Sequence, residues 1–334
     1  MGDAVLATCI FNTIKQNDPE AETFFVLNER IAPVFEGHPA IDHIITFSDE
    51  ERHNFRKYIA KVWGIMRKNR FDVVIDLRST MNTLPFTLFA RKAQYRIGIR
   101  KWYTPFFNYR FSACTADESM VHHDLSLLDP LGFKSVNPDF SLSVTDAERQ
   151  RFAAYLKDCG LDLNKPIALL GVTAKLPDKC WSFDGMEYVT QHLVSKYPDL
   201  QIIYNFAPGR EEKEAKMVYE KTGRDPHIFI NVKARSQREL CVMSTFVTLF
   251  FGNEGGTRHI VQASGKPSFV VVSPQQHSKV WVVQNDVAAG SIDVDDVLSP
   301  ESKATLNYQQ QYQALTPELV WNSFDSFIEQ NHLL

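Results

Sequence analysis

The sequence lacks the features that define several common classes of protein. Its five cysteines are odd in number, widely spaced and free of any C-x-x-C pair, which argues against a disulfide framework and a zinc site. No apolar run approaches the roughly 20 residues of a membrane-spanning helix, and the first residues lack the basic and then apolar profile of a secretory signal. We therefore expect a soluble cytoplasmic protein with buried, reduced thiols.

Two nucleotide-binding motifs are missing as well. No G-x-G-x-x-G follows any predicted strand, which makes a nicotinamide dehydrogenase an unfavoured assignment. The pattern G-x-x-x-x-G-K-[ST] is absent, so there is no Walker A loop. Any nucleotide must therefore be bound by other loops.

Regular alternation of strands and helices is what the sequence does contain. Short β-branched or aromatic runs, bounded by turn residues, predict buried strands. They lie at residues 23–27, 43–47, 72–77, 94–99, 167–171, 201–205, 227–231, 247–251 and 268–273. Helical patterns such as 184–197 and 211–222 lie between most of them. This alternation predicts an α/β fold with mostly parallel sheets.

The length of 334 residues is enough for two domains, each with its own core. Residues 136–166 look like the join, with a strand-like stretch at 140–144 and a helix at 145–159. We accordingly predict an N-terminal Rossmann-like domain at residues 1–160 and a C-terminal one at 161–334.

The beginning of the chain has an unusual order of elements. Gly2-Asp3 passes directly into a helical stretch at residues 4–15, whereas a glycine turn into a helix normally follows the first strand of an α/β domain. We therefore expect that the first N-terminal strand is missing. Truncation is the favoured interpretation. The alternative is a domain without its usual central strand, which would leave a hydrophobic slot at the centre of the sheet.

Positive charge is concentrated between residues 52 and 110, which hold 14 Lys or Arg against only Asp72 and Asp76. One interpretation is two solvated helix faces whose acidic neighbours lie elsewhere in the fold. The other is a surface for an anionic acceptor, a membrane face or nucleic acid. Nucleic acid is the least expected of these, because the net charge of the chain is −4 and no recognition module is present.

Three clusters of residues fall where a parallel sheet presents its ligand-binding edge, in loops that follow strands. The first is Gly2-Asp3, where glycine permits close backbone approach. Asp3 either caps the helix or acts as a base toward a bound hydroxyl. From the local sequence, the cap is the favoured role.

The second cluster is the loop at residues 171–181. Its hydroxyl and lysine groups, placed between a strand and a helix, suit a diphosphate, because cations and helix-terminal N–H groups stabilise negative charge. The alternative is a solvated loop whose Trp181 folds back on the core.

The third cluster is residues 251–259, which again follow a strand and lead into a helix. Two adjacent glycines at the helix start expose backbone N–H groups to an anion, and Glu254, Thr257 and His259 could contact sugar or phosphate oxygens. The alternative is an ordinary turn followed by a structural histidine.

Taken in order, these segments carry a resemblance to a known family. They are Gly2-Asp3-Ala4-Val5-Leu6, residues 73–78 and 96–99, His123 with 127–132, residues 173–181, and Gly252-Asn253-Glu254-Gly255-Gly256-Thr257-Arg258-His259 with Gly265-Lys266-Pro267. The chain resembles the family 9 glycosyltransferases, the ADP-heptose:lipopolysaccharide heptosyltransferases. The resemblance covers nearly the whole chain, and the last motif is its most specific part.

The resemblance implies a GT-B fold, in which two Rossmann-like domains face a central cleft. It implies transfer of heptose or a related sugar from ADP-heptose, with inversion at the anomeric carbon and without a metal or other cofactor. The expected acceptor is the lipopolysaccharide inner core, an anionic glycolipid, so peripheral contact with the cytoplasmic face of the inner membrane is expected too. It also supports the missing strand, since family members carry one just before their Gly-Asp motif.

Residue by residue, the resemblance implies the following roles. Asp3 matches the general base that takes the proton from the acceptor hydroxyl. The donor-binding residues would be Thr173, Lys179, Glu254, Gly255, Gly256 and His259, with Lys179 offsetting charge on the departing ADP. The family usually has Asp where this chain has Glu254, which bears on the identity of the donor sugar. Candidates for the anionic acceptor, resting on position and charge, are Arg78, Arg96 and Arg100.

Two other functions remain open at this point. A nucleotide-sugar epimerase would also place two Rossmann-like halves around a nucleotide sugar. A degenerate family member could bind a nucleotide sugar or a glycan without turning it over.

Overall fold

The computed structural model describes residues 1–334, which divide into two compact units. We call Met1–Leu6 with Ser141–Leu334 the C-terminal unit and Ala7–Phe140 the N-terminal unit. The chain thus divides at residues 140 and 141 rather than at the expected 160 and 161. Residues 140–144 form no strand, because their backbone is held by the C-terminal unit: Leu142 N donates to the Ala263 carbonyl at 3.2 Å.

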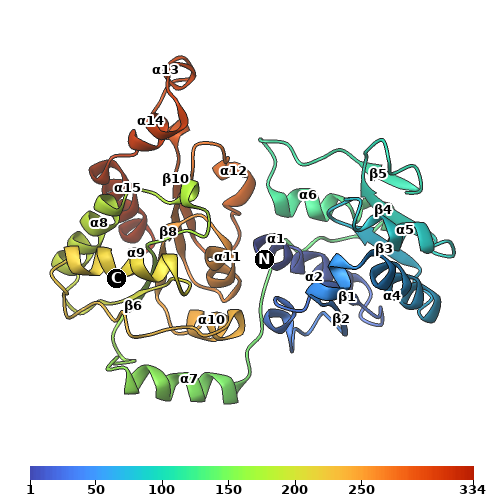
Figure 1. The fold of residues 1–334 in the computed structure, drawn as a ribbon, viewed down its shortest axis with the longest axis horizontal. Coiled ribbons are helices and arrows are strands. Elements are labelled where there is room, and N and C mark those ends of the chain that lie inside the picture. The colour runs from blue at the N-terminus through green and yellow to red at the C-terminus, as the bar shows by residue number, and fades with distance from the viewer. The chain divides into compact units, whose positions relative to one another are not determined.

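The C-terminal unit contains one five-stranded parallel sheet in the order β10-β9-β8-β6-β7 (Figure 1). Its strands are β6 (Ile167–Gly171), β7 (Gln201–Tyr204), β8 (Leu249–Asn253), β9 (Ser268–Val271) and β10 (Ala289–Ile292). All residues of β6 to β9 are buried. The core includes Phe251 of β8, whose ring packs against Phe269 and Phe324. Two-sided burial of this kind is typical of a parallel sheet.

Helices accompany this sheet along the chain. They are α1 (Gly2–Leu6), α7 (Asp146–Asp158), α8 (Phe183–Lys196), α9 (Arg210–Lys221), α10 (Gln237–Ser244), α11 (Gly256–Ala263), α12 (Ser278–Trp281), α13 (Pro300–Thr305), α14 (Tyr308–Gln313) and α15 (Pro317–Gln330). Helix α7 begins where it does because Thr145 and Glu148 form a capping box.

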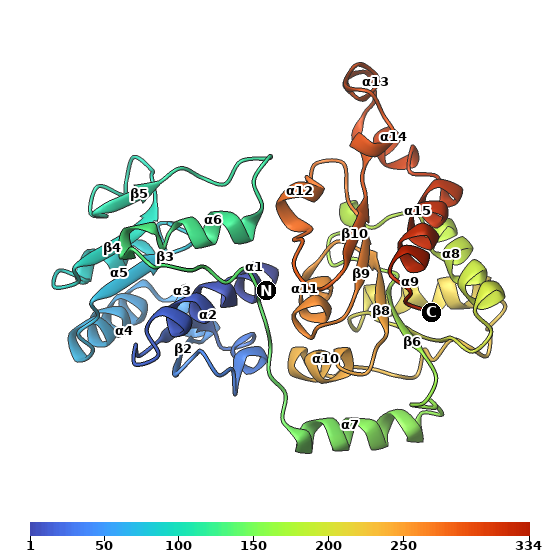
Figure 2. The same ribbon diagram turned by 180° about the vertical axis from the view of Figure 1, so that it is seen from behind.

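The N-terminal unit contains two separate parallel sheets, as Figure 2 shows from behind. One is β1 (Phe24–Asn28) with β2 (His43–Phe47), and the other has the order β3 (Val73–Asp76), β4 (Tyr95–Ile99), β5 (Tyr109–Phe111). The helices are α2 (Thr8–Asn17), α3 (Asp49–His53), α4 (Phe55–Lys68), α5 (Leu84–Phe89) and α6 (Met120–Ser126). None of the helices in either unit combines the length and apolar character needed to cross a bilayer.

Most predicted elements are confirmed, with a few exceptions. The helix expected at 4–15 is present as α1 and α2, interrupted at Ala7. The strand expected at 227–231 is wrong: the chain there makes a single bridge, between Ile228 and Ile202, because Asp225 turns the backbone by accepting from His227 N. The short strands β5 and β10 were not predicted.

Candidate functional site

Strands β6 and β8 are neighbours in the C-terminal unit, so the loops that follow them begin side by side at one edge of the sheet. Gly171 and Gly252 face each other across the last pair of the ladder. A Cβ at Gly252 would lie 2.6 Å from the Gly171 carbonyl oxygen, so a side chain there would force the strands apart. The close approach explains the glycine at position 252, one residue before β8 ends.

Asn253 ties the two loops together. Its Nδ2 donates to the Gly171 carbonyl at 3.1 Å, and its Oδ1 accepts from Trp181 N at 2.7 Å. The buried Trp181 ring packs against Gly185, and its Nε1 donates to the Leu315 carbonyl at 2.9 Å. Trp181 therefore serves the core, as one of the two interpretations of this loop expected.

Lys179 and Glu254, one from each loop, form an ion pair. Lys179 Nζ lies 2.5 Å from Glu254 Oε1, and Ser273 Oγ donates to the same oxygen at 3.1 Å. The Glu254 side chain is 12% exposed and that of Lys179 is 32% exposed. The pair thus sits at the surface of the sheet edge, where a ligand with negative charge could replace Glu254 as the partner of Lys179.

The backbone that carries Lys179 is held by two tyrosines of α14. Lys179 ends a short 3-10 helix, Pro177–Lys179. The Tyr308 hydroxyl donates to the Asp178 carbonyl at 2.6 Å, and the Tyr312 hydroxyl donates to the Lys179 carbonyl at 3.1 Å. These bonds fix the position from which the ammonium group reaches the site.

Helix α11 begins beside this pair at Gly255 and Gly256. No side chain caps its N-terminus, so its first N–H groups have no side-chain acceptor. The positive end of the helix dipole and these donors favour an anion at this point. A Cβ at Gly256 would lie 2.5 Å from the Met1 side chain, so glycine lets α1 pack against α11.

His259 is buried one turn further along α11. A Cβ at Gly2 would lie 2.8 Å from its ring, and the neighbouring Arg258 guanidinium lies 3.2 Å from both ring nitrogens. Burial and the Arg258 charge hold the pKa of His259 well below its usual value, so the imidazole is neutral. Burial lowers the pKa of Arg258 to about 10, which leaves it charged at neutral pH.

Thr173 is buried in the same loop as Lys179 but has a different partner. Its Oγ1 donates to Glu211 Oε2 at 3.0 Å, at the start of α9. Arg210, beside that glutamate, donates to the Ala174 and Lys175 carbonyls at 2.6 and 3.0 Å. The structure therefore groups Lys179 with Glu254, and Thr173 with α9.

Known proteins resemble this chain in both sequence and fold. The family model for glycosyltransferase family 9 (heptosyltransferase) matches residues 59–291. The chain belongs to this family. The lipopolysaccharide heptosyltransferase 3 of Escherichia coli K12 is 25% identical over 304 residues, which cover 83% of this chain and 80% of that protein.

Solved structures show the same architecture. A family 9 glycosyltransferase from Veillonella parvula superposes with a TM-score of 0.82 at 16% identity, covering 98% of this chain and 94% of that one. The E. coli heptosyltransferase WaaC, solved with ADP-2-deoxy-2-fluoro heptose, gives 0.69 at 16% identity and covers 99% and 96%. The chain is a glycosyltransferase with a GT-B fold of two Rossmann-like domains.

The remaining predicted residues of this glycosyltransferase are Asp3 in the C-terminal unit and three arginines in the N-terminal unit. Asp3 lies in the first turn of α1, with its side chain exposed. Arg78 and Arg100 follow the carboxyl ends of β3 and β4, and Lys101 Nζ donates to the Arg78 carbonyl at 3.5 Å. Arg96 lies near the opposite end of β4, where its Nε donates to Asn108 Oδ1 at 2.7 Å. The structure thus brings together two of the three predicted arginines.

Sequence reasoning missed three residues that contact the Lys179–Glu254 pair or the loop that carries Lys179. Ser273 was the last residue of a predicted strand, and its position at the carboxyl end was a usable signal. Tyr308 and Tyr312 lie in no motif, and nothing in the local sequence points to their contact with the Lys179 loop.

Proposed function

We propose that this glycosyltransferase transfers heptose from ADP-heptose to a lipopolysaccharide inner-core acceptor, with inversion and without a metal. The observation that carries the donor assignment is the Lys179–Glu254 pair beside the uncapped start of α11. An ADP diphosphate would take Lys179 as its counter-ion and the N–H groups at Gly255 and Gly256 as donors. WaaC, a relative in fold, was solved with ADP and with an ADP-heptose analogue.

In the proposed reaction, the acceptor hydroxyl oxygen attacks the anomeric carbon of heptose from the face opposite the ADP. The new carbon–oxygen bond forms as the bond to the β-phosphate oxygen breaks, which inverts the configuration. Asp3 takes the hydroxyl proton, and Lys179 offsets the charge that develops on the departing ADP. His259 is neutral and packs against Gly2, next to Asp3. Its proposed role is to hold this backbone in place and not to offset the charge of the departing ADP.

Glu254 is the residue that most sets this chain apart within the proposed site. Its carboxylate already accepts from Lys179 and Ser273, so donor binding must release Lys179 from it. The freed carboxylate can then accept from sugar hydroxyls. Arg78 and Arg100 would bind an anionic group of the acceptor. This glycolipid requires peripheral contact with the cytoplasmic face of the inner membrane.

Calorimetric titration with ADP and ADP-heptose tests the proposal. Lys179→Ala should weaken ADP binding by roughly tenfold to a hundredfold, because a charge-assisted contact to phosphate is lost. Lys175→Ala is the matched control, since this exposed lysine lies in the same loop and forms no ion pair. Asp3→Asn should abolish turnover and leave ADP affinity unchanged. Absence of ADP binding by the folded chain, or loss of ADP affinity in Asp3→Asn with turnover intact, would overturn these assignments.

A further inference from the structure

The N-terminal unit has a continuous segment of positive charge without any acid. Residues 77–116 contain seven Lys or Arg and no Asp or Glu. The side chains of Arg91, Lys92, Arg100 and Arg110 form no ion pair within the protein. Their charge is therefore available to an external anion.

The same unit exposes large apolar side chains. Trp102 is 90% exposed, and Phe106, four residues later, and Met81 are exposed as well. Every exposed aromatic side chain belongs to the N-terminal unit: Phe55, Trp63, Trp102, Phe106 and Tyr109. Leaving this much aromatic surface in water is unfavourable, so its concentration in one unit indicates an interaction surface.

The loop that carries Trp102 is anchored on both sides of the indole. The Tyr103 hydroxyl donates to the Ser79 carbonyl at 3.0 Å. Thr104 is fully buried, and its Oγ1 accepts from Lys101 N at 2.8 Å. With its neighbours fixed in this way, Trp102 is held outward by the fold.

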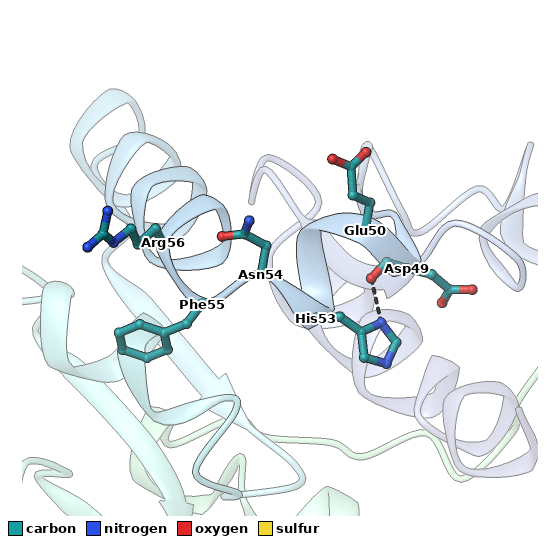
Figure 3. Close-up of a pocket in the computed structure, with 6 residues that line it drawn as sticks. All are labelled: Asp49, Glu50, His53, Asn54, Phe55 and Arg56. Atoms are coloured by element: carbon teal, nitrogen blue, oxygen red, sulfur yellow. Dashed lines mark hydrogen bonds between the residues drawn. The ribbon is translucent and has the colours of Figure 1, made fainter.

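This surface continues from the Trp102 loop to the start of α4. The Tyr58 hydroxyl donates to the Asn82 carbonyl, which places the exposed Met81 beside the first turns of α4. Phe55 and Arg56 project from that end of the helix, at the rim of an open hollow, and the Phe55 ring lies clear of the other labelled side chains (Figure 3). The surface thus carries aromatic and basic groups over two elements.

Acids near α4 do not cancel this charge, because cations within the protein already pair with them. At the hollow, Asp49 pairs with Arg30 and Arg52, and Glu50 pairs with Lys57. No ion pair involves Arg56. The arginine beside Phe55 therefore adds to the positive surface.

We propose that Phe55, Arg56, Met81, Lys101, Trp102 and Phe106 form an aromatic–basic patch that binds the surface of an anionic phospholipid bilayer. Indole and phenyl rings partition into the headgroup region, and Arg and Lys pair with lipid phosphates. The positive charge of the patch favours an anionic surface. The exposed aromatic rings favour a lipid surface, because they can insert among lipid headgroups. The inference rests on the proposed function, which requires access to a lipid-borne acceptor.

Sedimentation of the full chain with vesicles tests the patch. The protein should bind vesicles of phosphatidylethanolamine and phosphatidylglycerol, should not bind phosphatidylcholine vesicles, and should dissociate as salt is raised. Trp102→Ala should weaken binding roughly tenfold, and Arg56→Gln combined with Lys101→Gln should do so by about the same factor. Matched controls are Leu319→Ala and Lys213→Gln, which change an exposed apolar and an exposed basic residue of the C-terminal unit. Both controls should bind like the unmodified chain.

Several outcomes would overturn the patch. They are equal binding to both kinds of vesicle, binding that Trp102→Ala leaves unchanged, and a preference for an RNA oligonucleotide over the anionic vesicles. The vesicles contain no glycan and the assay no ADP-heptose, so the result is independent of transfer. A chain that binds ADP but not the anionic vesicles would contradict only the patch. A chain that binds the vesicles but not ADP would contradict only the proposed transferase function.

Discussion

The two units contain parallel sheets that differ in how far they are buried. Every residue of β6 to β9 in the C-terminal unit is buried. In the N-terminal unit, Val26 at the centre of β1 is 39% exposed, and Val73 and Val74 of β3 are only half-buried. The sheet of the C-terminal unit is therefore closed to solvent at the strands that carry its loops, whereas strands of the N-terminal unit remain partly exposed.

Strand pairing explains the difference. β1 pairs only with β2 and β3 only with β4, so each has one edge without hydrogen bonds to a neighbour. The two sheets are separate, and no strand of the structure pairs with both of them. Unpaired strand edges leave backbone groups to water and apolar side chains without cover. We therefore expect the N-terminal unit to be the less stable of the two.

The largest predicted effect comes from supplying a strand to these edges. A free apolar peptide of about six residues that pairs with an open edge of β1 or β3 should stabilise the N-terminal unit by about 3 kcal/mol at a hundredfold excess over its Kd. Hydrogen–deuterium exchange should show slower exchange in β1 or β3, with β8 unchanged. A Gly/Ser peptide of equal length is the control. Equal protection by both peptides would show that the open edges are not what limits this unit.

A smaller effect should distinguish matched valines in the two sheets. Val271→Ala in β9, where the side chain is fully buried, should cost about 2–3 kcal/mol of unfolding free energy. Val26→Ala in β1 should cost about 0.5 kcal/mol or less, because much of that side chain already contacts water. Urea unfolding of both variants measures the difference. If both variants lost a similar unfolding free energy, the Val26 side chain would be buried in solution and the proposed contrast between the two sheets would be wrong.

The sequence predicted the closed sheet better than the open one for physical reasons. The strands β6 to β9 are apolar runs bounded by turn residues, which is the pattern of a strand buried on both faces. β10 contains Gly290 and Ser291 and β5 has three residues, so neither shows a run long enough to detect. The run at 227–231 has the right composition but a single bridge to β7, a tertiary property that composition does not reveal.

The candidate site was predictable as loops but not as contacts. Glycines and charged residues after β6 and β8 predicted two loops that the structure places side by side at one edge of the sheet. The pairing of Lys179 with Glu254 and Ser273 depends on β6, β8 and β9 lying side by side in the sheet, which no local pattern specifies. Likewise, only the packing of α14 brings its tyrosines to Lys179.

The smallest predicted effect is an acid sensitivity that both units share. Arg238, at 2.8 Å, holds the pKa of Glu148 at about 2, and Lys15, at 2.8 Å, holds that of Asp42 at about 2. Both values are depressed, so the stabilisation is complete above the unfolded pKa values, near 4, and is lost as pH falls toward 2. Arg238→Gln and Lys15→Gln should each remove about 1 kcal/mol at neutral pH, since both pairs are partly solvated.

Each of these two variants should also flatten the acid dependence of its own unit. Arg238→Gln should do so for the C-terminal unit, where the pair joins α7 to α10, and Lys15→Gln for the N-terminal unit, where the pair joins α2 to the turn before β2. Hydrogen exchange at pH 3 and pH 6 measures both effects. If Lys15→Gln changed exchange equally in both units, the two would unfold as one, and the contrast between the closed and open sheets would not extend to their stabilities.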